Sequence, residues 1–370
     1  MRALPHQYVD RSTGAVQNET LLGDRVIFWM YNRLRERPGT MFRALVSKRF
    51  SSLIGWAHYD LCRSVPPGQL RRAVRALNLN ELEFVKDTDR MQTFRELFER
   101  QIRYCECRPM NPDRDVISSP ADARMLAGSF SSQSSLYIKD KFFDFDELLG
   151  WDYSQWRTIF RDGDFAVFRL TPDKYHYNHM PVSGYIADIY DIPGLYHACN
   201  PSAVIQAVTP LSKNRRTVSI VDTDVADGTG IGYVAMIEIA ALMIGDIVQC
   251  YSDVAYESPR SVQPGLFVRK GQPKSLFRPG SSTTVLIFEK DRVRFSADLL
   301  ANQQRSDVIS RYSIGFNQPL AETDVPVRSE IAVAARRKVC DAVGAVWRQA
   351  QPFLNGKGIE AVTAPRGIAA

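Results

Sequence analysis

A turn leads directly into a strand-like run in the segment Phe277-Arg-Pro-Gly-Ser-Ser-Thr-Thr-Val-Leu-Ile-Phe-Glu-Lys290. Pro279 and Gly280 favour the turn, because proline restricts one backbone angle and glycine accepts conformations that other residues avoid. The residues from 284 to 288 are rich in β-branched and aromatic side chains, which favour strands. By local chemistry alone, Ser281 and Ser282 belong to a serine-rich hairpin turn before a buried strand.

Six more segments after Cys107 share this strand-like character. Each is short, β-rich or alternating in polarity, and bounded by glycine, proline, asparagine or aspartate. The segments are 165–170, 203–208, 217–221, 234–239, 247–251 and 293–295. They predict an α+β fold whose body, over 108–330, is predominantly β.

The N-terminal third has a helical character instead. Residues 1–20 are polar and show no periodicity, which predicts a flexible terminus. From residue 21 onward, bulky apolar residues recur at helical spacing among arginines and lysines. We therefore expect a helical, basic region over 21–107. Residues 331–370 are rich in alanine, arginine and valine, and the sequence leaves open whether this C-terminal tail is helical.

Positive charge is concentrated in the same third of the chain. The formal net charge is +6, and residues 1–110 hold 19 basic against 12 acidic residues, so the remainder sums to −1. Such a region suits nucleic acid, an anionic membrane surface or solubility alone. Its apolar residues suit an amphipathic helix in a lipid headgroup layer, or a helix packed on its own core.

Several classes of protein and site are not expected. The apolar run 26–31 is far shorter than the roughly 20 residues that cross a bilayer, and no small-residue cleavage site follows it. We therefore expect neither a transmembrane helix nor a signal peptide. The six cysteines are scattered, and the pair Cys105 and Cys107 has no nearby partner for zinc. We expect reduced thiols and no metal.

Three polar pieces of the chain are candidates for chemistry. His176 and His179 lie three residues apart in a proline-bounded segment, a pattern that suits a structural role, acid–base chemistry or metal binding. Asp122 lies in Ser118-Ser-Pro-Ala-Asp-Ala-Arg124, which by itself suggests a surface turn. The serine pair of the opening segment is the third piece. No one of them identifies a site alone.

In order and spacing, these pieces together resemble the phosphatidylserine decarboxylase family. Ser119-Pro-Ala-Asp-Ala123 matches the family's Ser-Pro-Ala-Asp-Gly motif, and Tyr175-His-Tyr-Asn-His-Met-Pro-Val-Ser-Gly184 matches Tyr-His-Arg-x-His-x-Pro-x-x-Gly. Gly280-Ser-Ser-Thr283, followed by Phe288-Glu289, matches a Gly-Gly-Ser-Thr sequence before a strand that ends in Phe-Glu. The resemblance extends over most of the chain, from about residue 40 to residue 330.

The resemblance implies a proenzyme that cleaves itself and makes a covalent pyruvoyl cofactor. Ser282 would be the nucleophile and pyruvoyl precursor, His179 its base, and Asp122 the carboxylate that orients His179. The Ser282 oxygen would attack the carbonyl of Ser281, and elimination would cut the chain between the two serines. A β chain ending at Ser281 and an α chain beginning at Ser282 would remain together.

The resemblance also implies the reaction and its setting. The pyruvoyl carbonyl would bind the amine of phosphatidylserine and accept the electrons released with carbon dioxide, giving phosphatidylethanolamine. His176 would be the proton donor in this decarboxylation. We expect a peripheral enzyme on the cytoplasmic side of an anionic membrane, docked through region 21–107, with no nucleic-acid partner. A homodimer is left open.

Departures from the family pattern keep two alternatives open. Ser282 is the reactive serine because only that register aligns the flanks from Phe277 to Glu289 without a gap. Ser281 then replaces a glycine at the scissile bond and crowds the attacked carbonyl. Further departures are Ala123, Lys174, Tyr177, Ile239-Ala-Ala-Leu242 and Pro273-Lys-Ser-Leu-Phe277. The alternatives are a decarboxylase of a soluble amino acid or derivative, and an unprocessed lipid-binding homologue without activity.

Overall fold

The computed structural model describes residues 4–21, 23–31, 46, 47, 49, 53, 65–138, 142–207, 209–242, 246–279 and 282–335. Residues 1–334 form one compact unit, and 335–370 form a second, of which Ala335 alone is described. Every element below belongs to the first unit.

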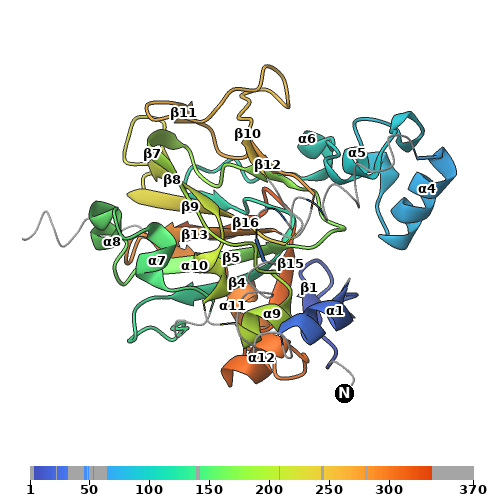
Figure 1. Cartoon of the computed structure of the whole chain (residues 1–370). Helices are drawn as coiled ribbons and strands as arrows, with labels where there is room; N and C mark the ends of the chain where they lie inside the picture. Colours follow the sequence, from blue (N-terminus) through green and yellow to red (C-terminus); the bar gives the residue numbers. More distant parts are fainter. Residues whose placement is uncertain are drawn as a thin grey trace, which may run out of the picture. The chain divides into compact units, whose positions relative to one another are not determined.

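A ten-stranded sheet occupies the centre of this unit (Figure 1). The strand order is β11-β7-β8-β9-β13-β5-β4-β15-β1-β2, and among these strands only β1 and β15 are parallel neighbours. The strands are β1 (Gln7–Asp10), β2 (Val16–Asn18), β4 (Ala123–Ser129), β5 (Asp164–Leu170), β7 (Gly184–Ile192), β8 (Arg216–Asp222), β9 (Tyr233–Ala240), β11 (Phe267–Val268), β13 (Ser282–Phe288) and β15 (Glu322–Val325). Strand β13 is therefore held by a partner on each side.

Two three-stranded sheets and short helices complete the described fold. The small sheets are β10 (Ile247–Gln249), β12 (Pro273–Phe277) and β6 (Tyr177–His179), and β14 (Val293–Phe295), β16 (Glu330–Ala334) and β3 (Val116–Ser118). The helices are α1 (Asp24–Trp29), α4 (Pro67–Ala76), α5 (Phe94–Phe98), α6 (Tyr104–Cys107), α7 (Phe145–Leu149), α8 (Ser154–Ile159), α9 (Pro201–Gln206), α10 (Pro210–Lys213), α11 (Ala297–Gln303) and α12 (Arg311–Phe316), with single turns η2 (Glu81–Glu83) and η3 (Thr88–Arg90). The predicted α+β fold with a mainly β body is confirmed.

Side-chain alternation along β13 separates two hydrophobic cores. Leu286 and Phe288 belong to one cluster, whereas Val285 and Ile287 belong to the other. Since successive residues of a strand point to opposite faces, Ser282 lies on the same face as Leu286 and Phe288. The face of the sheet on which Ser282 lies is thus decided by its register in β13.

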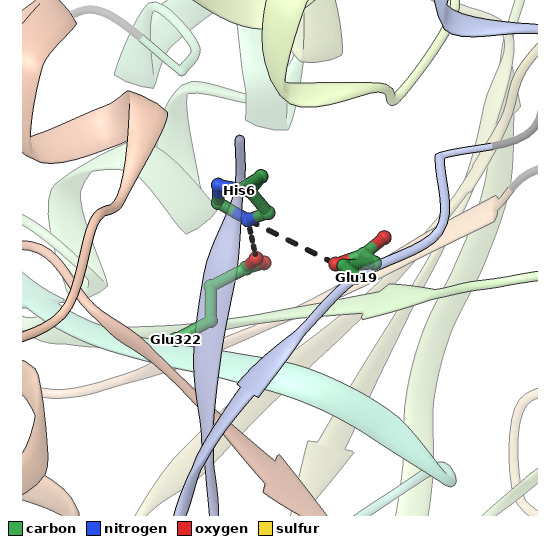
Figure 2. A group of neighbouring side chains, drawn as sticks. All are labelled: His6, Glu19 and Glu322. Atoms are coloured by element: carbon green, nitrogen blue, oxygen red, sulfur yellow. Dashed lines mark hydrogen bonds and ion pairs between the residues drawn. The ribbon is translucent and has the colours of Figure 1, made fainter. Parts of the chain in front are cut away.

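The N-terminal residues differ from the flexible terminus that we expected. Strands β1 and β2 extend the large sheet, and the residues that flank them are held by buried charges. His6 Nε2 lies 2.7 Å from Glu322 Oε2 (Figure 2). Arg169 contacts both Glu19 and Glu322 at 2.6 Å. The expectation is wrong for the described residues up to 20, because ion pairs distant in sequence order them.

The predicted strand over 203–208 is also wrong, since most of it lies in helix α9. The Asn200 side chain accepts a hydrogen bond from the Ser202 backbone N–H, and Pro201 occupies the first helical turn. Asparagine at the N-cap with proline behind it is a strong start signal for a helix. Here these signals outweigh the strand preference of Val204 and Ile205.

Helix α4 shows how the basic region uses its apolar residues. Leu70 and Val74 are buried in a hydrophobic cluster, whereas Arg71, Arg72 and Arg75 are exposed. This helix therefore packs on the protein's own core, which is the second of the two interpretations given for the apolar residues of this region. Much of the expected helical region, including 32–45 and 54–64, lies outside the described residues.

Two other expectations concern the chain's C-terminal tail and membrane spans. Within the tail expected over 331–370, Ile331 to Ala334 continue strand β16, and the residues after 335 lie outside the described part. None of the helices in the described part of the chain combines the length and the apolar character that crossing a bilayer demands.

Candidate active site

Ser282 is the first residue of the central strand β13. It pairs across the sheet with Leu170 of β5 and Ala240 of β9, and its side chain is fully buried. Its Oγ has no hydrogen-bond partner among the described residues. Ser281, the other half of the expected cleavage site, lies outside the described residues. The structure thus places the candidate nucleophile in a strand paired on both sides and gives its hydroxyl no partner among the described residues.

The histidine segment lies against the face of the sheet that carries Ser282. Thr284, which shares that face, donates a hydrogen bond of 2.9 Å from its hydroxyl to Asn178 Oδ1 of strand β6. The small sheet continues one residue before β6, because the Phe277 N–H donates to the His176 carbonyl at 3.0 Å. Strand β6 is therefore docked onto the nucleophile strand by a side-chain contact.

Strand alternation separates the two candidate histidines. Asn178 points toward β13, so His176, two residues earlier, lies on the same side of the segment. Tyr177 and His179 point to the opposite side, where Tyr175 stacks on Tyr177 with ring centroids 5.4 Å apart. The structure brings both histidines into one segment but turns them to different sides.

His179 is held by hydrogen bonds at both ring nitrogens. Its Nδ1 lies 2.9 Å from the Gly271 carbonyl oxygen, and its Nε2 lies 2.9 Å from the Tyr175 hydroxyl. A carbonyl oxygen only accepts, so Nδ1 carries the proton and Nε2 carries the free lone pair. Burial lowers the pKa of His179 to about 3, and the Gly271 carbonyl offsets this only in part. The ring is neutral near pH 7, as a general base must be.

Gly271 is a site residue whose role sequence reasoning missed. Its φ of 78° lies in the left-handed region that favours glycine. A side chain here would collide with the Met110 sulfur, because an added Cβ would lie 2.3 Å from it. The Lys270-Gly271 pair was a signal for this turn, but only the structure shows that the turn presents its carbonyl to His179.

No hydrogen bond joins Asp122 to His179 among the described contacts, so the expected orienting role stays a prediction. It forms a bidentate ion pair with Arg108, at 3.0 Å to Nε and 2.8 Å to Nη2, and accepts the Val327 N–H at 2.7 Å. Burial alone would raise the pKa of Asp122, but the charge and hydrogen bonds of Arg108 outweigh it and hold the pKa low. Asp122 stays near His179 because the His179 N–H donates to the Pro120 carbonyl at 2.7 Å.

His176 has unused hydrogen-bonding capacity. Both ring nitrogens are buried without a partner in the described part of the chain, and the ring packs on Phe98 with centroids 3.7 Å apart. Burial, together with the nearby positive charge of Arg100, lowers the pKa of His176 to about 3. The expectation that this imidazole titrates near neutral pH is therefore wrong for the arrangement described. A neutral ring with two free nitrogens remains available to a reacting group.

A buried ion pair beside the nucleophile strand, with its glutamate on the neighbouring strand β9, is a second feature that sequence reasoning missed. Lys274 Nζ lies 2.6 Å from Glu238 Oε2, and both side chains are fully buried. Glu238 also accepts from Ser275 and from Asn178, which in turn contacts Thr284. The signal was a lysine within a strand of otherwise uncharged residues, since buried lysines are almost always paired.

The cluster of His6, Glu19 and Glu322 has the residue types of a metal site, with ligand atoms within 4.8 Å of one another (Figure 2). Arg169, however, donates to both glutamates, at 2.8 Å to Glu19 and 2.9 Å to Glu322. Its guanidinium already supplies one positive charge that the two carboxylates share. His6 Nδ1 further accepts the Arg311 N–H at 3.2 Å. We interpret the cluster as a structural ion-pair network.

Ser282, whose hydroxyl has no partner among the described residues, lies on the face of the sheet that the histidine segment contacts, and comparisons identify the family. A family model described as phosphatidylserine decarboxylase matches residues 94–312. The phosphatidylserine decarboxylase proenzyme of Fusobacterium nucleatum is 28% identical over 306 residues, which cover 80% of this chain and 92% of the relative. That of Clostridium tetani is 26% identical over 295 residues, covering 80% and 91%. Proenzyme 2 of Oryza sativa is 35% identical over 235 residues, covering 62% and 34%. The chain belongs to the phosphatidylserine decarboxylase family and is a carboxy-lyase.

Proposed function

We propose that this chain is a self-processing enzyme that decarboxylates phosphatidylserine to phosphatidylethanolamine. The names of its relatives support both the substrate and the proenzyme state. The observation that carries the proposal is the buried Ser282 hydroxyl, which has no partner among the described residues at the start of β13. A buried polar group without a partner costs free energy, so its retention calls for a chemical role.

The pyruvoyl group would be made from the chain itself. Ser282 Oγ attacks the carbonyl carbon of Ser281, so the peptide bond becomes an ester and the Ser282 nitrogen becomes an amine. Elimination then breaks the bond between Cβ and Oγ of Ser282 and leaves Ser281 with a free carboxylate. Water finally displaces the nitrogen of the new dehydroalanine as ammonia. Ser282 fits this precursor role because its hydroxyl has no competing partner in the described residues.

His179 is the proposed base for the first step. Its Nε2 carries the lone pair that can take the Ser282 proton. In the described arrangement Nε2 accepts the Tyr175 hydroxyl, so it must exchange this partner before cleavage. The strand alternation favours a second assignment, in which His176 is the base, because His176 lies on the side of β13. Single variants of the two histidines separate these assignments.

Asp122 is proposed to assist His179 through its charge. Burial is the largest influence on His179 and lowers its pKa, whereas the negative charge of Asp122 raises it. A carboxylate kept ionised by Arg108 would stabilise the imidazolium that forms when His179 takes a proton. Asp122 is in this sense a positioning residue rather than a direct partner.

His176 is the proposed proton donor in decarboxylation. When formed, the pyruvoyl carbonyl would bind the substrate amine and withdraw the electrons released with carbon dioxide. His176 would then protonate the substrate carbon from a ring nitrogen that has no partner among the described residues. Since burial lowers its pKa to about 3 in the described arrangement, it must gain that proton during the reaction cycle.

The basic N-terminal region is proposed to dock the enzyme peripherally on the cytoplasmic side of an anionic membrane. Leu82 and Val85 are 79% and 51% exposed beside the buried Phe84, which shares a hydrophobic cluster with α4. The exposed arginines of α4 add positive charge, and each basic residue near an anionic surface contributes about 1 kcal/mol. Exposed apolar residues next to arginines suit a lipid headgroup layer.

Two measurements test this function. Denaturing electrophoresis with intact mass should show two chains, ending at Ser281 and beginning at Ser282 with a pyruvoyl group. One uncut species of 41.9 kDa would contradict self-processing. Vesicle co-sedimentation with carbon dioxide release should show activity on phosphatidylserine vesicles. Release from free amino acids without vesicle binding would instead establish the soluble-substrate alternative.

A further inference from the structure

A polar cavity of about 180 Å³ lies beside the histidine segment. Its wall includes Tyr175 and six charged side chains, namely the cations Arg100, Arg108 and Lys174 and the carboxylates Glu83, Asp122 and Asp173. Tyr175 is the direct neighbour of His176 in the chain. The cavity therefore borders Asp122 and the start of the histidine segment.

Two of the three cations already have acidic partners. Arg108 lies 2.8 Å from Asp122 and 2.9 Å from Glu83. Lys174 lies 2.7 Å from Asp324. The charges of Arg108 and Lys174 are therefore balanced within the protein, and neither side chain is left to bind a ligand anion.

Arg100 differs, because no carboxylate of the described residues lies within ion-pair distance of it. Its Nη2 donates to the Asp173 backbone carbonyl at 2.6 Å and its Nη1 to the Leu97 carbonyl at 3.3 Å. Its Nε is buried and has no partner in the described part of the chain. The guanidinium also lies 5.5 Å from the centroid of the Phe84 ring.

Such a buried, unpaired guanidinium is unfavourable by itself. Burial lowers the pKa of Arg100 to about 10, and the more distant Asp122 and Asp173 offset this only in part. Buried charges are normally paired, since removing a charge from water costs several kcal/mol. An anion in the cavity would supply the missing partner and satisfy Nε.

The position of Arg100 connects this anion site to the reaction. Phe98, two residues earlier, packs directly on the ring of His176 at 3.7 Å. The charge of Arg100 is close enough to act on the pKa of His176. An anion bound at Arg100 would thus lie near the proposed proton donor.

We propose that Arg100 binds the phosphodiester group of the phosphoserine headgroup. The inference rests on the proposed function, in which the substrate carries both a phosphodiester and a carboxylate. A cation on the carboxylate would stabilise the charge that is lost as carbon dioxide leaves, and so would slow the reaction. The phosphodiester keeps its charge throughout, so Arg100 binds it equally in substrate and transition state. Arg100 is accordingly a specificity-determining residue.

The kinetic test uses Arg100→Met in the mature enzyme, with Arg90→Met as a control that removes an exposed cation outside the cavity. A short-chain, micelle-free phosphatidylserine keeps membrane docking out of the measurement. Arg100→Met should raise KM at least tenfold and change kcat less than threefold, since it removes uniform binding. Arg90→Met should change neither. A loss confined to kcat, or an unchanged KM, would overturn the proposal.

A binding test is independent of activity. Glycerophosphoserine and inorganic phosphate are titrated calorimetrically into uncleaved Ser282→Ala protein, with and without Arg100→Met. Both probes should bind only when Arg100 is present, whereas free serine, which has the carboxylate alone, should not bind. Equal binding with and without Arg100, binding of serine alone, or no binding of either phosphate probe would overturn the proposal.

Arg100→Lys decides the case if Arg100→Met does not fold. Lysine keeps the charge but lacks the planar guanidinium, so phosphate binding should weaken at least threefold. Unchanged affinity in a folded Arg100→Lys protein would refute the role. Failure of the proposed function is distinguishable, because the wild-type chain would then remain uncut or inactive while the binding test still reports on Arg100.

Discussion

The Thr284 hydroxyl donates to the Asn178 side-chain oxygen at 2.9 Å, and this contact ties the nucleophile strand to the histidine segment. Thr284 lies two residues after Ser282, and Asn178 lies between the two candidate histidines. Because the contact is buried, it fixes the position of the Ser282 strand relative to the histidine segment. The relative placement of serine and histidines therefore depends on a pair of side chains with no chemical role of their own.

Thr284→Val should slow self-cleavage and lower the free energy of unfolding by about 1–3 kcal/mol, since it leaves the Asn178 oxygen without its donor. Thr283→Val is the matched control, because Thr283 lies on the opposite face of the same strand. Cleavage rates come from timed electrophoresis, and stability comes from urea unfolding. Equal cleavage rates in the two variants would show that the contact does not position the site.

Ser281→Gly should cleave faster than the wild type, because glycine relieves crowding at the attacked carbonyl. Ser282→Ala should stay uncut, since it lacks the nucleophile. Ser281→Ala controls for loss of the neighbouring hydroxyl and should cleave at about the wild-type rate. Intact mass over time measures all three. If Ser282→Ala were still cleaved, Ser282 would not be the reactive serine.

His179→Gln should block cleavage, whereas His176→Gln should still be cut and lose turnover by about 10²–10⁴-fold, the usual contribution of a general acid. Electrophoresis reports the first effect, and carbon dioxide release by the cut protein reports the second. If His176→Gln remains uncut and His179→Gln is processed, the roles are reversed, as the strand alternation allows.

Stability should fall as the pH drops from about 6.5 toward 3. Burial lowers the folded pKa of His176 and His179 to about 3, below the ordinary value of 6.5, so the unfolded chain binds more protons in this window. Within this window each such histidine lowers the free energy of unfolding by about 1.4 kcal/mol for every unit by which the pH falls. Above about pH 6.5 it has no effect. His179→Gln should flatten the dependence of the unfolding free energy on pH by about that slope. If the unfolding free energy of the wild type and of His179→Gln changed in parallel with pH, the pKa of His179 would not be lowered in the folded protein.

Lys274→Met should lower the free energy of unfolding by about 3–5 kcal/mol, because it leaves Glu238 buried without its counter-ion. Arg71→Ala is the comparison, since it breaks an exposed, solvent-screened pair with Asp89 and should cost far less stability than Lys274→Met. Urea unfolding measures both. Combining Lys274→Met with Glu238→Gln should recover part of the loss, and no recovery would mean that the pair does not act as a unit.

Most of the predicted strand segments were correct because β-branched and aromatic runs act over neighbouring residues, but strands such as β4 and β7 were not predicted. The run after Ser282 became β13, and the run before Leu170 became β5. The same rule failed at α9, where Asn200 and Pro201 start a helix in a run that contains Val204 and Ile205. A helix cap is also local, so this error was avoidable.

The sequence by itself determined the family and the α+β class and named the candidate residues Ser282, His176, His179 and Asp122, because motif order and residue type are properties of the chain. Tertiary structure decided which groups meet. It paired Asp122 with Arg108, gave His179 the Gly271 carbonyl, and left the hydroxyl of Ser282 without a partner among the described residues. These outcomes depend on strand register and on contacts between residues far apart in the chain. No local pattern encodes such contacts, since their free energy arises only when the sheets pack together.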